Sequence, residues 1–128
     1  MLDHIGFAVL DYDHSRSFYD KALAPLGYLM LFEVTPEMSG AGSHAGYGAK
    51  DRPQFWIGTG KIKGGHFHIA FQAENRAAVD AFYQAALAAG GKDNGPPGIR
   101  AHYHPDYYGA YVIDPDGHNI EAVCHKAE

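Results

Sequence analysis

Apolar positions along the chain recur with two different periods. Short apolar runs that alternate with polar residues are typical of strands, whereas apolar residues three or four positions apart are typical of helices. Apolar residues recur every fourth position from Phe18 to Leu26, so we expect a helix over residues 15–26, ended by Gly27. A second helix is expected over residues 76–89, because a similar pattern ends there at two glycines.

Short strands are expected on both sides of these helices. The predicted strands cover residues 2–9, 28–34, 44–49, 54–58, 67–73, 108–113 and 119–124, with weaker strands after the second helix. The last two form a hairpin, because Asp114-Pro115-Asp116-Gly117 between them is a strong turn sequence. The expected order of strand, helix and three strands therefore occurs twice along the chain.

An internal repeat supports this order. The sequence His4-Ile5-Gly6-Phe7 matches His68-Ile69-Ala70-Phe71 at an offset of 64 residues, and the same offset superposes the Phe-Tyr pairs of the two helices. We therefore expect an α+β fold in one domain over residues 1–128, made of two βαβββ modules at about residues 1–60 and 65–128. The glycine-rich segment 59–65 is the predicted linker.

Composition narrows the class of protein. Hydrophobic residues make up 46% and charged residues 20% of the 128 positions, which excludes wholesale disorder. A formal net charge of -5 argues against nucleic-acid binding, and no apolar run is long enough to span a membrane. The start of the chain shows no secretory signal, and the single cysteine, Cys124, cannot form an internal disulfide, so we expect a cytoplasmic protein. Cys124 is interpreted as a buried structural thiol rather than a nucleophile.

Two histidines occupy equivalent positions in the repeat. If the modules are related by a pseudo-two-fold axis, His4 and His68 approach each other across it, and neutral imidazoles are good ligands for divalent metals. The alternative is that each ring bonds a backbone group and has no metal. His66 is a rival to His68, because residues two apart share a strand face.

A carboxylate in an apolar strand is the third candidate ligand. Glu121 lies between Ile120 and Ala122, where it needs a partner unless it faces water at an edge. His4, His68 and Glu121 together suit Zn, Mn, Fe or Ni. Tyr103 and His104 belong to the densest polar and aromatic cluster of the chain, and are the candidate catalytic acid or base. The alternative is that this cluster is a surface loop.

These residues carry a resemblance to a known family. The opening Asp3 to Val9, the Phe18-Tyr19 helix ending in Leu26-Gly27-Tyr28, the His68 strand and the segment Asp114 to Glu121 resemble the vicinal oxygen chelate superfamily. That superfamily includes glyoxalase I, extradiol dioxygenases, fosfomycin-resistance transferases and bleomycin-binding proteins. The resemblance covers essentially the whole chain.

The resemblance implies two paired modules around a U-shaped cavity, with metal ligands on the first and last strand of each module. It maps His4, His68 and Glu121 onto three of these positions. The last strand of the first module, where a fourth ligand is common, has no histidine or carboxylate, and only Gln54 stands nearby. A site with three ligands is therefore expected.

The resemblance also implies a function. We expect a metal-dependent lyase, isomerase or dioxygenase acting on a small molecule with vicinal oxygens; the alternative is a metal-free drug-binding protein of the bleomycin-resistance type. A homodimer is expected, and the modules pair either within one chain or between two. In the second arrangement, His4 comes from one chain and His68 with Glu121 from the other.

Overall fold

The computed structural model describes residues 3–61 and 64–128. The first half contains β1 (Ile5–Val9), α1 (Tyr12–Leu23), the 3-10 helix η1 (Ala24–Leu26), β2 (Leu29–Val34), α2 (Pro36–Ser39), β3 (His44–Gly48) and β4 (Phe55–Thr59). The second half contains β5 (His68–Gln72), α3 (Arg76–Ala88), β6 (Lys92–Ile99), β7 (Tyr108–Ile113) and β8 (Asn119–Cys124). The start of the first predicted strand, at residue 2, and residues 62–63 of the predicted linker lie outside the described residues.

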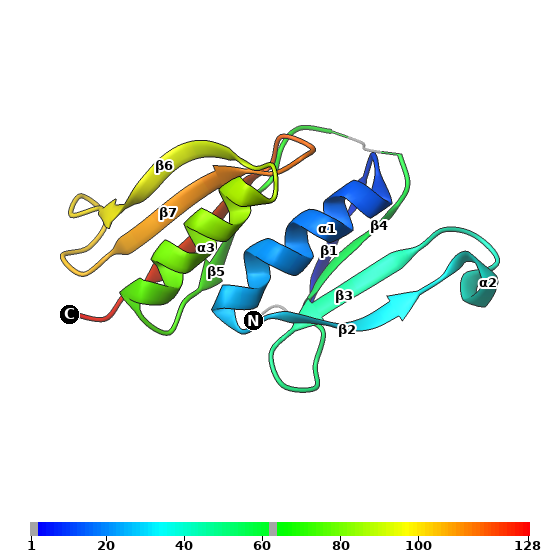
Figure 1. The fold of residues 1–128 in the computed structure, drawn as a ribbon, viewed down its shortest axis with the longest axis horizontal. Coiled ribbons are helices and arrows are strands. Elements are labelled where there is room, and N and C mark those ends of the chain that lie inside the picture. The colour runs from blue at the N-terminus through cyan, green and yellow to red at the C-terminus, as the bar shows by residue number, and fades with distance from the viewer. Residues whose placement is uncertain (1–2, 62–63) are drawn as a thin grey trace.

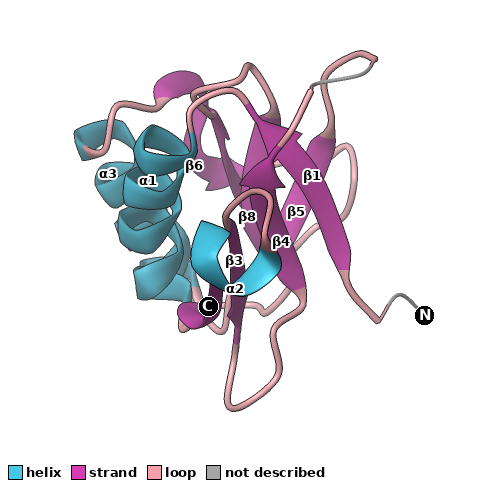
Figure 2. Cartoon of the chain, turned by 90° about the vertical axis from the view of Figure 1, so that its right-hand side faces the viewer, coloured by secondary structure: helices cyan, strands magenta, loops and turns pink. Residues whose placement is uncertain are grey.

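The strands form two four-stranded sheets, one from each half. Their orders are β1-β4-β3-β2 and β5-β8-β7-β6, and in each the first strand runs parallel to the last one of its half. Helices α1 and α3 pack against each other, and both cover the same face of the two sheets (Figures 1 and 2). The predicted α+β fold of two βαβββ modules is therefore confirmed. The two sheets do not close into a barrel.

Local chemistry sets the helix ends. The Asp11 carboxylate accepts a hydrogen bond from the backbone N–H of His14, so α1 begins at Tyr12, three residues before its predicted start. Gly27 follows η1 with a φ of 81°, a left-handed conformation that glycine adopts without strain. The short helix α2 was not predicted: Thr35 caps it and Pro36 starts it.

The core lies between the helices and the sheets. Phe18 and Tyr19 of α1 and Phe82 of α3 are fully buried there, as the helical spacing predicts. The Tyr19 hydroxyl donates to Asp114 at 2.6 Å, so a helix of the first half is bonded to the β7–β8 turn of the second. Neither α1 nor α3 covers the opposite face of the two sheets (Figure 2).

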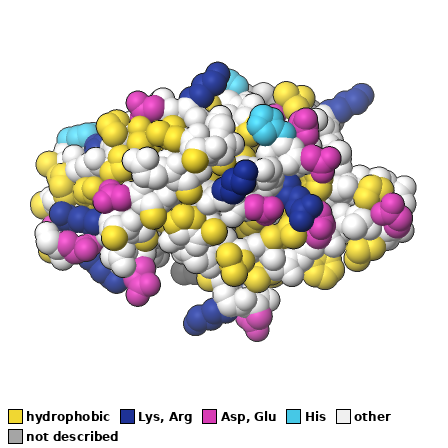
Figure 3. Space-filling view, in the orientation of Figure 1, with side chains coloured by type: hydrophobic (Ala, Val, Ile, Leu, Met, Phe, Trp, Pro, Cys, Tyr) yellow, Lys and Arg dark blue, Asp and Glu magenta, His cyan; other side chains and the backbone are white. Residues whose placement is uncertain are grey.

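The helix-bearing face has a mixed surface. Basic and acidic side chains are interspersed over it (Figure 3). No helix among the described residues is long and apolar enough to cross a membrane.

Candidate functional site

A histidine and a buried carboxylate meet on the open face of the second sheet. Side chains alternate along β8, so Ile120 and Ala122 face the core and Glu121 faces the opposite side. Glu121 is nevertheless only 1% exposed. The Nε2 atom of His68 lies 2.9 Å from its Oε2, because β5 runs beside β8 in parallel register. The His68 side chain is 55% exposed, so this pair is open to solvent on the histidine side.

Tyrosines cover the other side of the carboxylate. The hydroxyl of Tyr107 donates a hydrogen bond to Oε1 of Glu121. Burial, and then this hydrogen bond, raise the pKa of Tyr107 above its usual range. Tyr111 is the cross-strand partner of Glu121, and its pKa is also raised, first by burial and then by the charge of Glu121. Both phenols therefore stay protonated at neutral pH.

A cavity of about 500 Å³ opens beside this cluster. It is lined by His68, Tyr103, Tyr107, Tyr111, Asn119 and Glu121. Its volume suits a small molecule. The His68–Glu121 pair and the side chains of three tyrosines thus line the same cavity.

The remaining predicted ligand lies elsewhere. His4 immediately precedes β1, its side chain is 61% exposed, and its Nδ1 lies 2.8 Å from the Asp3 carboxylate. Asp3 in turn is paired with Arg52. Over residues 3–61 and 64–128, no three His, Cys, Asp or Glu side chains are close enough together to hold a metal ion. Within one chain the structure therefore brings together two of the three predicted ligands.

The other residues singled out in the sequence differ in whether they lie at this cavity. His66 lies beside Gly117 and the ring of His118, so His68 is the histidine that reaches Glu121. Tyr103, 63% exposed, lies at the cavity, whereas the ring of His104 lies 6.1 Å from that of His125 and does not line it. Cys124 is fully buried, as its interpretation as a structural thiol requires.

The family model of the Glyoxalase/Bleomycin resistance protein/Dioxygenase superfamily matches residues 1–122. The chain belongs to this superfamily. A glyoxalase/bleomycin resistance protein from Albidiferax ferrireducens is 29% identical, with a TM-score of 0.81 over 97% of this chain and 98% of that one. No curated protein matches the chain.

Two solved structures of lower identity share the fold. A mutant of the fosfomycin resistance protein FosX from Listeria monocytogenes, complexed with Mn(II) and 1S,2S-dihydroxypropylphosphonic acid, is 19% identical, with a TM-score of 0.69 over 99% of this chain and 93% of that one. A glyoxalase I mutant from Zea mays is 20% identical, with a TM-score of 0.70 over 99% of this chain and 45% of that one.

The first module of this glyoxalase-superfamily chain has no carboxylate at the position equivalent to Glu121. In the second module Glu121 is paired with Ala70, and in the first module Trp56 is paired with Gly6, the residue equivalent to Ala70. Trp56 thus occupies the place that Glu121 has in the other half. Gln54, the only nearby ligand-type residue suggested by the sequence, lies two residues before it.

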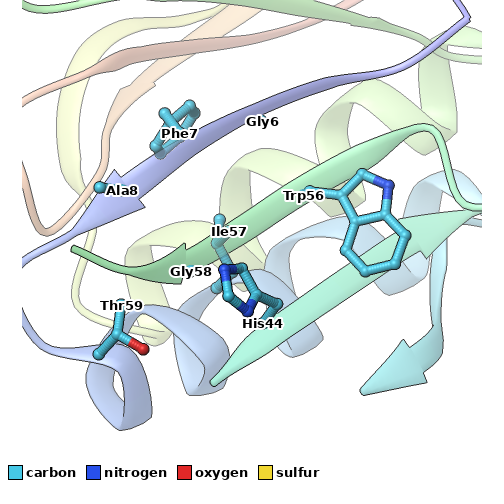
Figure 4. A pocket seen from close by; sticks show the side chains of 8 residues that line it. All are labelled: Gly6, Phe7, Ala8, His44, Trp56, Ile57, Gly58 and Thr59. Atoms are coloured by element: carbon cyan, nitrogen blue, oxygen red, sulfur yellow. The ribbon is translucent and has the colours of Figure 1, made fainter. Parts of the chain in front are cut away.

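A second hollow lies beside this tryptophan. It has a volume of about 290 Å³ and is lined by Gly6, Phe7, Ala8, His44, Trp56, Ile57, Gly58 and Thr59. Figure 4 shows Trp56 and His44 on the face of the first sheet that is turned away from the helices. This hollow contains no acidic side chain and differs in that respect from the cavity beside Glu121.

The contacts of Tyr107 and Tyr111 with Glu121 were not predicted from the sequence. Tyr107 belongs to the cluster of histidines and tyrosines before the final hairpin, but spacing does not show which ring of that cluster turns toward Glu121. Tyr111 is identified only by the β7–β8 register, in which it faces Glu121. With the turn at 114–117 predicted, counting outward from that turn would have found it.

Proposed function

We propose that the protein is a divalent-metal-dependent enzyme that acts on a small molecule with two adjacent oxygens. The observation that supports this is the His68–Glu121 pair at the mouth of a cavity. A carboxylate that is 1% exposed requires a positive partner or several hydrogen bonds. An imidazole nitrogen and a carboxylate oxygen are suitable donors for Mn, Fe, Zn or Ni.

A second copy of the chain supplies the third ligand in this proposal. The described residues around His68 and Glu121 include no third ligand of the usual kinds, and protein sites for these metals generally use three or more. His4 is exposed, and among residues 3–61 and 64–128 the partner of its side chain is the neighbouring Asp3. In a two-fold dimer each copy offers its His4 to the other copy's pair, so two equivalent sites form.

The residues around the pair have distinct proposed tasks. His68 and Glu121, together with His4 of the second copy, would hold the divalent ion, and a bound ion would supply Lewis-acid polarisation of the substrate's adjacent oxygens. Tyr107 orients the Glu121 carboxylate through its hydrogen bond. Tyr103, exposed at the cavity, is the proposed proton donor to the substrate. His104 has no part in this proposal, because it does not line the cavity.

The reaction class follows from this chemistry. Candidate substrates are hydroxy-carbonyl compounds, catechols and thiohemiacetals, and the candidate reactions are those of lyases, isomerases and dioxygenases. The FosX structure supports the proposal because it has the same fold and was solved in complex with Mn(II) and 1S,2S-dihydroxypropylphosphonic acid. A metal-free drug-binding protein would have no need for a buried carboxylate bonded to an exposed histidine.

Metal content measured by elemental analysis tests the proposal. We expect the wild type to bind close to one metal ion per chain. His4→Ala, His68→Ala and Glu121→Gln should each reduce affinity for that metal at least about tenfold while the far-ultraviolet circular dichroism is unchanged. A folded wild type that binds none of Mn(II), Fe(II), Zn(II) and Ni(II) would contradict the proposal.

Mixing two variants tests the shared site. His4→Ala and Glu121→Ala each lack a ligand, but a mixed dimer has one intact site, formed by His4 of one copy and the His68–Glu121 pair of the other. Unfolding the two together and refolding them should restore about one quarter of the wild-type metal content, since half of the dimers are mixed and each has one good site of two. No recovery in dimers shown to be mixed would place all ligands in one chain.

A further inference from the structure

Arg100 is a cation without an acidic partner on the open face of the second module. Each of the other three arginines, Arg16, Arg52 and Arg76, has a carboxylate oxygen within 4.0 Å. In the part of the chain that the structure describes, no carboxylate lies that close to the Arg100 guanidinium. The side chain is nevertheless partly buried, where an arginine is usually paired. Its charge is therefore available to a bound anion.

The guanidinium of Arg100 is held in one place. Its Nη2 atom donates a hydrogen bond to the carbonyl oxygen of Pro96 at 2.6 Å. Its central carbon lies 5.4 Å from the centre of the Tyr111 ring, at the distance of a cation–π contact. A Cβ atom at Gly98 would lie 2.9 Å from Nη1, so this glycine leaves room for the guanidinium. Because the group is already ordered, binding an anion to it costs little conformational entropy.

Most donors of this guanidinium remain free for a ligand. A guanidinium has five N–H donors. Among the described residues, the bond to the Pro96 carbonyl is the one hydrogen bond that the Arg100 side chain makes. Two parallel N–H groups are therefore available for the two oxygens of one anionic group.

The hollow beside Arg100 adjoins the cavity beside Glu121. It has a volume of about 270 Å³. Tyr103, Tyr111 and Asn119 line both the hollow and the cavity. The remaining lining residues of the hollow carry no acidic group; they are Asn94, Gly95, Arg100 and His102. One small molecule can therefore extend from the buried carboxylate to the guanidinium.

The Tyr111 ring limits the length of such a molecule. The ring centres of His68 and Tyr111 are 6.4 Å apart, and the guanidinium carbon of Arg100 lies 5.4 Å from the same Tyr111 centre. The imidazole and the guanidinium are therefore separated by no more than the sum of these two distances. That separation fits a compact molecule with one ring and a short charged arm, and the tyrosine rings offer flat walls for its ring.

We infer that Arg100 binds the carboxylate of an anionic small molecule that occupies this cavity. A guanidinium and a carboxylate are both planar and form paired, charge-assisted hydrogen bonds. One permanent cation balances one negative charge, which favours a carboxylate over a doubly charged phosphate group. The inference goes beyond the proposed function, because it concerns binding alone and requires neither a metal ion nor a second copy of the chain.

Three acids and their amides test the inference. The acids para-hydroxybenzoate, para-hydroxyphenylacetate and para-hydroxyphenylpropanoate share a phenol ring and differ in the length of the arm that carries the carboxylate. Each has a neutral amide of nearly the same shape. Calorimetric titration of the metal-free protein should show at least one acid binding about tenfold more tightly than its amide, because the amide lacks the charge-assisted bonds to Arg100. A phosphonate of the same arm length should bind more weakly than that acid, and tighter binding would overturn the choice of a carboxylate.

Three variants separate the charge of Arg100 from the shape of the cavity. Arg100→Gln should remove the preference for the acid and leave the affinity for the amide unchanged, whereas damage to the cavity would weaken both. Arg100→Lys keeps a positive charge without the planar fork and should restore part of the preference. Lys92→Gln removes an exposed cation from the same strand, β6, and as the matched control should leave the preference unchanged.

Two results in the wild type would overturn the inference: equal affinity of every acid and its amide, and failure of all three acids to bind. A preference retained in Arg100→Gln would overturn it as well. Because the titrations use metal-free protein, a wild type that binds no metal would contradict the proposed function and leave this inference standing.

Discussion

Glu121 lies on the face of the second sheet that is turned away from the helices, and its carboxylate contacts two side chains there. Its two oxygens have different partners, since Oε2 faces His68 and Oε1 accepts from Tyr107. The carboxylate is therefore held in one orientation, with the exposed imidazole between it and solvent. Orientation of a metal ligand by a neighbouring hydrogen bond commonly affects metal affinity by about 10- to 100-fold.

Tyr107→Phe removes this hydrogen bond and keeps the ring. Because the Glu121 carboxylate loses its orienting donor, we expect the affinity for the proposed metal to fall about tenfold. Competition titration against a chelator of known affinity measures the change. Tyr103→Phe, which removes a hydroxyl at the same cavity that is not bonded to Glu121 among the described residues, is the matched control and should leave metal affinity unchanged. Equal losses in the two variants would contradict the assignment.

At the scale of the elements, the β7–β8 turn is hydrogen-bonded to the first module. Oδ1 of Asp114 accepts hydrogen bonds from the backbone N–H groups of Asp116 and His118. Oδ2 accepts from the buried hydroxyl of Tyr19 on α1. Asp116 adds contacts to the backbone of Leu10 and to the Ser15 hydroxyl. A turn predicted from sequence as a local hairpin thus also joins the two modules.

Asp114→Ala should destabilise the protein strongly. It leaves two backbone N–H groups and the Tyr19 hydroxyl without their acceptor in a site that is 4% exposed, for an expected loss of about 3 kcal/mol in the free energy of unfolding. Urea denaturation measures it. Tyr19→Phe removes only one of these hydrogen bonds and should cost about 1 kcal/mol. A loss below that of Tyr19→Phe would show that the turn does not depend on the carboxylate.

At the scale of the whole molecule, most tyrosines lie in environments that raise their pKa. Eight of the nine tyrosines have a raised pKa, and for Tyr19 and Tyr47 burial is the largest cause, followed by the nearby carboxylates Asp114 and Asp20. Tyrosines of an unfolded chain ionise near pH 10. Above that pH the folded chain binds more protons than the unfolded one. The free energy of unfolding therefore falls as the pH rises.

We expect the free energy of unfolding to fall as the pH rises above about 10. Below that pH the tyrosines make their full contribution to this free energy. Urea midpoints at pH 8, 9.5 and 11 measure this. Absorbance of ionised tyrosine near 295 nm should stay low in the folded protein at pH 10. Ionisation of about half of the tyrosines at pH 10 with the fold intact would contradict the prediction.

Several elements were predicted closely because they depend on local signals. The bounds of β7 and β8 agree with the predicted strands, since a strong turn sequence separates two clear apolar runs. The predicted helix of residues 15–26 is divided into α1, which ends at Leu23, and the 3-10 helix η1, which ends at Leu26 before the predicted stop at Gly27. Four residues are too few to show a period, which is why α2 was missed. The early start of α1 depends on which of several acidic residues caps the helix, and that choice requires backbone geometry.

The sequence by itself determined the repeat, the α+β class and the family, because these depend on residue types at regular spacing along the chain. It also pointed to His68 and Glu121, since a carboxylate in an apolar strand needs a partner. Only the tertiary structure decided that these two meet without His4, that Tyr107 bonds the carboxylate, and that Trp56 occupies the equivalent position in the other module. Those facts depend on strand register and on contacts between residues distant in the sequence, which arise only when the sheets and helices pack together.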